Sequence, residues 1–169
     1  MINNDEIFAN GVALIYQNDY DGFLELVDNH PTALIQTDDY HRNLFHYACA
    51  FQREEIISLL LKDGLDPNKK NSEKQSPFEV YLRACPEFSM EDGSFNPNKI
   101  PTINEFVAYG AYVSTMTLNN FDGQQSQNKA FKKDHKIILK ILEDVWSDQS
   151  LASWRKPKRP NPRPPKFRL

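Results

Sequence analysis

Histidine, cysteine, serine and acidic side chains carry most enzyme chemistry and most metal binding, and this chain spaces them too widely for either. The only cysteines, Cys49 and Cys85, lie among apolar, helix-forming neighbours, which indicates reduced, buried thiols. The four histidines are dispersed, so no residues have the spacing of metal ligands. The glycines form no phosphate-binding loop, and no serine has the surroundings of a catalytic nucleophile. The sequence therefore predicts a protein that is not an enzyme and binds no cofactor or metal.

Charge is unevenly divided along the chain. Seven of its 20 basic residues lie after Ser150, where Asp and Glu are absent, so the first 150 residues carry 13 basic and 23 acidic side chains, a formal charge of −10. Such an acidic body disfavours broad contact with nucleic acid. No apolar run approaches the roughly 20 residues of a membrane helix, and the acidic start Met1–Glu6 does not resemble a signal peptide. We expect a cytoplasmic protein that is monomeric alone.

Helical segments recur with a period of 33 residues. In both Asn43–Ala48 and Ser76–Tyr81 a small polar residue precedes an apolar helix, which is the place of an N-cap. Between them, Glu55–Gly64 has apolar residues at helical spacing and ends on a glycine, the residue that most readily takes the left-handed conformation closing a helix. Pro67 then turns the chain. The predicted unit is a helix, a tight turn, a second helix and an extended loop.

The same pattern continues more weakly on both sides of this central unit. One period earlier, Asn10–Ile15 and Gly22–Val27 predict a first pair of helices that ends at Pro31. Phe106–Ala111 follows Leu60–Leu65 by 46 residues, so the third unit contains 13 extra residues. A final pair is expected at about 121–131 and 134–147. The predicted units are about 5–37, 38–70, 71–116 and 117–148.

These segments resemble the ankyrin repeat. Leu44-Phe45-His46-Tyr47-Ala48 stands where the family has Pro-Leu-His-x-Ala, and Gly64-Leu65-Asp66-Pro67-Asn68 matches the exit of its second helix. The third unit keeps Ser76-Pro77-Phe78 and Gly110-Ala111 but has Glu79 in place of the histidine. The resemblance implies an all-α ankyrin-repeat solenoid of about four units within residues 1–150, with degenerate first and last caps. It also implies that His46 bonds to backbone and ties neighbouring loops together.

The function that this resemblance implies is capture of another protein on the concave face formed by loop tips and first helices. The aromatic and arginine residues expected there are types that are enriched at interfaces. Phe51 has two open interpretations, contact with a partner or packing against the neighbouring repeat. The stand-alone, Asn-, Asp-, Lys- and Phe-rich chain also looks like ankyrin proteins of intracellular bacteria or viruses, some of which are effectors delivered into host cells. The predicted surface comprises Asp39, Tyr40, Arg42, Phe51, Ser72, Glu73, Gln75, Arg83, Leu118, Asn119 and Phe121.

The extra residues of the third unit fall near Pro86–Ile100, between its two helices. They include Phe88, Met90 and Phe95 among acidic residues. A helix connection of this length is unusual and is often functional. The alternative is a mobile loop whose aromatic residues cover the stack, and the sequence favours neither.

The segment 151–169 is basic and proline-rich, and we expect it to be disordered. One interpretation is a ligand for polyproline-reading domains, with Arg159 preceding a Pro-x-x-Pro pair at Pro162 and Pro165. A second is an adaptor segment attached to nucleic acid or an anionic membrane. The third, which we favour over each of the others, is a solvated or self-docking tail attracted weakly to the acidic body.

Overall fold

The computed structural model describes residues 3–84, 99–113 and 139–149. Over these ranges the regular structure is helical and no strand is present, so the expected all-α class is confirmed. None of the described helices is both long and apolar enough to cross a membrane. The chain divides into two compact units, one reaching Tyr81 and the other beginning at Leu82, and each is described by itself below.

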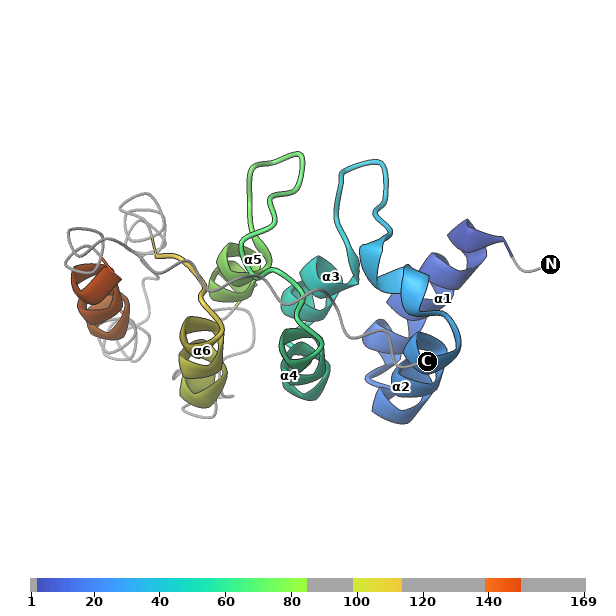
Figure 1. Cartoon of the computed structure of the whole chain (residues 1–169), viewed down its shortest axis with the longest axis horizontal. Coiled ribbons are helices and arrows are strands. Elements are labelled where there is room, and N and C mark those ends of the chain that lie inside the picture. The colour runs from blue at the N-terminus through green and yellow to red at the C-terminus, as the bar shows by residue number, and fades with distance from the viewer. Residues whose placement is uncertain (1–2, 85–98, 114–138, 150–169) are drawn as a thin grey trace, which may run out of the picture. The chain divides into compact units, whose positions relative to one another are not determined.

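The first unit is built from paired helices. α1 lies against α2 and α3, and α4 lies against α3 and α2. A short 3₁₀ helix, η1, follows α2 and begins at the proline that was expected to end the pair. The bounds are α1 (Asn4–Gln17), α2 (Tyr20–Asn29), η1 (Pro31–Ile35), α3 (Leu44–Ala50), α4 (Glu54–Lys62) and α5 (Pro77–Ala84), which crosses into the second unit (Figure 1).

Side-chain caps start the first helix of each pair. The carbonyl oxygen of the Asn43 side chain accepts a bond from the backbone N–H of His46 at 3.1 Å. The Ser76 hydroxyl accepts from the backbone N–H of Glu79 at 3.2 Å, and the Glu79 carboxylate accepts from the Ser76 N–H at 2.8 Å. These bonds satisfy backbone donors that a helix leaves free in its first turn. The N-caps predicted at Asn43 and Ser76 are confirmed.

Left-handed residues close three of the helices in this unit. Gly64 has a φ of 85°, as its sequence context predicted. Asn18 and Gln52, with φ of 60° and 55°, take the same conformation without being glycine. The buried Gln52 side chain donates to the backbone carbonyls of Cys49 at 3.2 Å and Tyr81 at 2.9 Å, and these bonds hold the residue in place.

The core of the first unit lies between the two layers of helices. Its largest fully buried side chains include Phe23, Phe45, Ile57, Leu60 and Phe78, and each such side chain contributes about 1.5–3 kcal/mol by leaving water. Gly11 lets α1 approach α3, since a Cβ atom there would lie 3.0 Å from a methyl carbon of Leu44. Cys49 is a free, buried thiol, as expected, and Cys85 lies outside the described residues.

The second unit contains α6 (Lys99–Ala108) and a helical segment, 139–149. α6 is followed by Gly110 with a φ of 84°, as its likeness to the Gly64 turn predicted. The side-chain amide of Gln149 donates to the carbonyl of Ala111 at 2.9 Å and accepts from the N–H of Val113 at 3.1 Å. The last helix therefore continues past its expected end at Ser147, to a residue that fixes the chain after α6.

Replacing Leu60 by alanine should lower the free energy of unfolding by about 2–5 kcal/mol. The side chain is fully buried, with 0% of its surface exposed, so its removal leaves a cavity. Leu59→Ala deletes the same atoms from a partly exposed neighbour and should cost clearly less. Urea unfolding followed by circular dichroism compares the two variants. Equal losses would contradict the assignment of this face of α4 to the core.

Candidate functional site

Two loops of the first unit share one hydrogen-bond framework. In the first loop (36–43), the Asp38 side chain accepts from the backbone N–H of Arg42 at 2.8 Å, and the Asp38 N–H donates to the Arg42 carbonyl at 3.0 Å. In the second loop (69–76), Asn71 makes the same two bonds with Gln75, both at 2.9 Å. Corresponding residues lie 33 positions apart. The period seen in the sequence is thus also a period of backbone structure.

The left-handed residue of each loop follows the same period. His41 has a φ of 56° and Lys74 has a φ of 61°. Each precedes the residue that closes its loop, and its N–H donates to the carbonyl of Asp38 or Asn71 at 2.9 Å. Figure 1 shows both loops extending from the same side of the helices in this unit.

Three hydrogen bonds connect the two loops. The Ser72 N–H donates to the Tyr40 carbonyl at 2.9 Å, and the Ser72 hydroxyl lies 2.8 Å from Nδ1 of His41. Nε2 of His46 lies 3.2 Å from the carbonyl of Gln75, to which it donates. The predicted structural role of His46, bonding to backbone and tying neighbouring loops, is confirmed.

The surroundings of His46 favour a neutral imidazole. The residue is buried, and its Nδ1 accepts from the backbone N–H of Asn43 at 3.3 Å while Nε2 faces Gln75. Burial lowers the pKa of His46 below its ordinary value, although the bond to Gln75 acts in the opposite direction. Both ring nitrogens are engaged in the fold, so this histidine serves structure.

Glu79 takes the position of His46 one period later. Its carboxylate accepts from the Ser76 N–H at 2.8 Å and forms an ion pair with Lys70. The glutamate thus supplies the helix cap that the imidazole supplies in the preceding unit. Lys70 is half exposed, so the ion pair itself contributes little to stability.

An arginine lies between two tyrosine rings beside the first loop. The guanidinium carbon of Arg42 is 5.0 Å from the ring centroids of both Tyr40 and Tyr47. Its Nε donates to Asp38 at 2.7 Å, and the Tyr47 hydroxyl donates to the same carboxylate oxygen at 2.8 Å. Burial acts to raise the pKa of Asp38, but the bonds from Arg42 and Tyr47 outweigh it and lower that pKa. The carboxylate therefore stays charged and holds the arginine in place.

Two further ring contacts join α1 to the α3 region. Phe8 meets Tyr47 edge to face, with centroids 6.1 Å apart, and Tyr16 meets Phe51 in the same way at 5.3 Å. We call the set Phe8, Tyr16, Tyr40, Arg42, Tyr47 and Phe51 the aromatic surface. Tyr16 is 64% exposed and Tyr40 is 60% exposed. Phe51 follows the end of α3 and packs against α1, so its packing interpretation holds, while part of its surface stays accessible.

The predicted binding residues fall into three groups. Tyr40, Arg42 and Phe51 belong to the aromatic surface, while Asp39, Ser72 and Glu73 are exposed on the two connected loops and Gln75 holds the second loop closed. Arg83 is exposed but belongs to the second unit. The other predicted positions lie outside the described residues: Phe88, Met90, Phe95, Leu118, Asn119, Phe121, Arg159, Pro162 and Pro165.

Sequence reasoning missed half of the aromatic surface. Phe8 and Tyr16 are eight residues apart on α1, and Tyr47 precedes Phe51 by four, so each pair shares one side of a helix. That spacing was an available signal. The sequence could not show that these sides meet, because the contacts depend on how α1 packs on α3.

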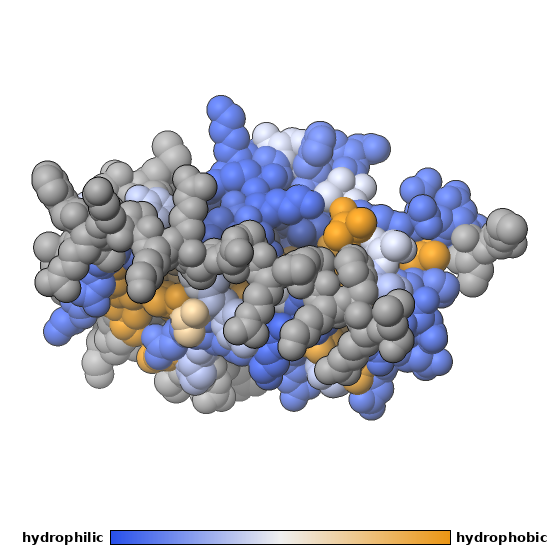
Figure 2. Space-filling view, in the orientation of Figure 1, coloured by the Kyte–Doolittle hydropathy of each residue, from blue (hydrophilic) through white to orange (hydrophobic). Residues whose placement is uncertain are grey.

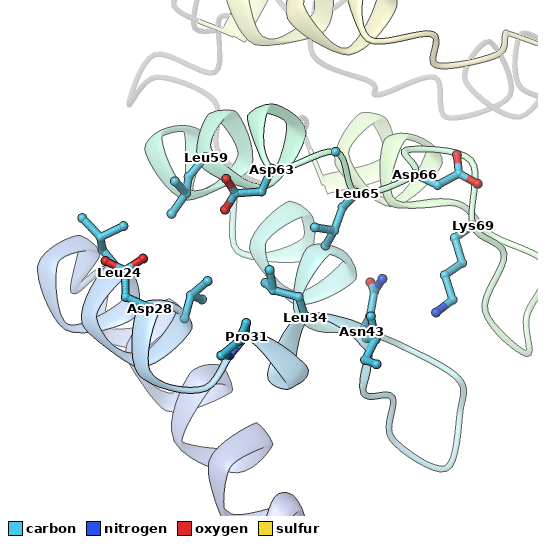
Figure 3. A pocket seen from close by; sticks show the side chains of 13 residues that line it. Leu24, Asp28, Pro31, Leu34, Asn43, Leu59, Asp63, Leu65, Asp66 and Lys69 are labelled. Atoms are coloured by element: carbon cyan, nitrogen blue, oxygen red, sulfur yellow. The ribbon is translucent and has the colours of Figure 1, made fainter. Parts of the chain in front are cut away.

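A second hollow, also missed, lies in the first unit between α2, η1 and the end of α4. Its volume is about 210 Å³. Figure 3 shows Leu24 and Asp28 on α2 across from Leu59 and Asp63 on α4, with Leu34 and Leu65 between them. We call this hollow the α2–α4 groove. The remaining lining residues are Val27, Pro31, Ile35, Asn43, Gly64, Asp66 and Lys69.

The rest of the described surface offers little that points to chemistry. Among the described residues, no group of three or more His, Cys, Asp or Glu side chains is placed to hold a metal ion. On the face drawn in Figure 2, hydrophilic side chains cover most of the described surface and apolar ones form small separate groups. No protein-family model and no curated protein matches the sequence.

The free energy of unfolding should depend on the protonation of His46. A lowered pKa in the folded state means that the unfolded chain takes up the proton more readily. This contribution is complete above the ordinary value of 6.5 and is lost as the pH falls through it toward the folded-state value. Urea unfolding should therefore show falling stability from about pH 7.5 to about pH 5.5.

His46→Gln separates this effect from other titrations. The variant keeps a polar side chain at the position but removes the titrating imidazole. We expect it to be less stable than the native chain at neutral pH and to depend less on pH across the same range. An unchanged pH dependence would contradict the role assigned to the buried imidazole.

Proposed function

We propose that this chain is a non-catalytic protein-binding module of the ankyrin-repeat type. It binds a partner protein through the aromatic surface together with the exposed tips of the two connected loops. The single observation that carries the proposal is the exposed Tyr40 ring stacked on Arg42, which is itself anchored to Asp38. Tyrosine and arginine are the residue types that most often dominate binding energy at protein interfaces.

The repeat class is supported by the recurring loop framework. Identical backbone bonds and left-handed residues return after 33 residues, and the helix after each loop begins with a side-chain cap. A period of 33 residues, with two helices and a turn, is the unit length of ankyrin repeats. Such repeats bind their partners along a continuous surface of loop tips and first helices.

Preorganisation explains why this surface suits binding. The guanidinium of Arg42 is held by a carboxylate and between two rings, so little side-chain freedom remains to be lost when a partner binds. The loop that carries it is fixed to the next loop through Ser72. A rigid aromatic and arginine cluster therefore presents contact area at low entropic cost.

Tyr40→Ala should weaken binding at least tenfold, because it removes an exposed ring that the fold itself uses little. Partners are first identified by affinity purification of the tagged full chain and mass spectrometry. The affinity of the main purified partner is then measured by calorimetry. Phe8→Ala tests the α1 side of the surface in the same way.

Tyr109→Ala is the matched control. It removes the same ring from a position that is 45% exposed in the second unit, and affinity should stay within about twofold of the native value. Native affinity in both Tyr40→Ala and Phe8→Ala would show that the partner binds elsewhere on the chain.

A further inference from the structure

The α2–α4 groove combines an apolar floor with an acidic rim. Leu24, Val27, Leu34, Leu59 and Leu65 contribute aliphatic carbon to the floor. The rim carries the three carboxylates of Asp28, Asp63 and Asp66, and Lys69 is the one basic residue in the lining. Asp28 and Asp66 are exposed and Asp63 is half-buried. A complementary occupant therefore has apolar side chains flanked by basic ones.

The size of the groove restricts this occupant further. A volume of about 210 Å³ is smaller than the roughly 300–1,000 Å³ of pockets that enclose small-molecule ligands. Ile35, at the edge of the groove, is 61% exposed, so the apolar surface continues outward. A groove of this size and openness suits one or two side chains of a peptide segment.

We propose that the α2–α4 groove binds the chain's own segment Arg163–Leu169. This segment lies outside the described residues, and its chemistry comes from the sequence. It contains three basic residues, no acidic residue, and the apolar side chains of Phe167 and Leu169. Three cations thus match three carboxylates. In an extended backbone, Phe167 and Leu169 point to one side and Lys166 and Arg168 to the other, so the apolar pair enters the groove while the charges meet its rim.

The chain's other segments outside the described residues suit the groove less well. The insertion 85–98 carries Glu87, Glu91 and Asp92, which the acidic rim repels. The segment 114–138 carries Asp122 and Asp134 among its basic residues. Only the region after Ser150 combines several basic residues with aromatic and leucine side chains and no acid. Charge complementarity therefore selects the C-terminal segment among these.

Nuclear magnetic resonance on the full, ¹⁵N-labelled chain tests the proposal. Order parameters of the Lys166, Phe167, Arg168 and Leu169 amides should approach the rigid range, about 0.8. In the double variant Asp28→Asn, Asp66→Asn they should fall below about 0.6. Neither change threatens the fold, since Asp28 is an acid in the last turn of α2 and asparagine can still accept the bond that Asp66 accepts from the Asn68 N–H.

The matched control is the double variant Asp21→Asn, Glu55→Gln. It removes the same charge from the first turns of α2 and α4, outside the groove lining, and it should leave the order parameters of the segment unchanged. Phe167→Ala, which alters no described residue, should lower them as the groove variant does.

Two results would overturn the proposal. One is low order parameters for the segment in the native chain. The other is values that respond equally to the groove variant and to its control. If a synthetic peptide of sequence 163–169 shifts the groove amides while the chain's own segment shows neither order nor response, the groove accepts a partner segment, and self-docking is wrong.

Discussion

The bond from the buried imidazole of His46 to the carbonyl of Gln75 links one loop of the first unit to the next. A buried polar ring must have partners, because an unsatisfied one costs about 1–3 kcal/mol. The imidazole meets this requirement by receiving the Asn43 N–H and donating to Gln75. Helix start and loop position are therefore determined together. The spacing of the two loops, and with it the bonds through Ser72, depends on this one residue.

The aromatic surface depends on the same arrangement one layer outward. Arg42 closes the first loop with its backbone and stacks on two rings with its side chain. Asp38 receives both the backbone and the side-chain bonds, and it also receives the Tyr47 hydroxyl. One carboxylate thus connects loop geometry to the orientation of an exposed arginine. A surface that binds other molecules can be rigid because its anchor is also part of the loop.

The sequence predicted those parts of the fold that are coded locally. N-caps at Asn43 and Ser76 and the left-handed residues Gly64 and Gly110 follow from short-range rules, and the structure has all four. The left-handed conformation of Gln52 could not be read from its residue type, because its support comes from the Tyr81 carbonyl, 29 positions later. Likewise, the pairing of Phe8 with Tyr47 requires the packing of α1 on α3. Long-range contacts of this kind leave no short-range pattern.

The exchange of histidine for glutamate at position 79 shows how a repeat can keep its shape and lose a link. The carboxylate caps α5 as the imidazole caps α3, since each accepts a backbone N–H from the preceding N-cap residue. An ionised carboxylate, however, has no proton to donate. Glu79 therefore cannot repeat the bond that His46 makes to a later carbonyl, and it pairs instead with Lys70, which lies before it in sequence. Within the second unit, the side-chain amide of Gln149 binds both Ala111 and Val113. An amide both donates and accepts, so it can fix the chain after α6 without a histidine. The departures from the repeat pattern thus follow from the proton inventory of the side chains that replace its conserved-looking polar residue.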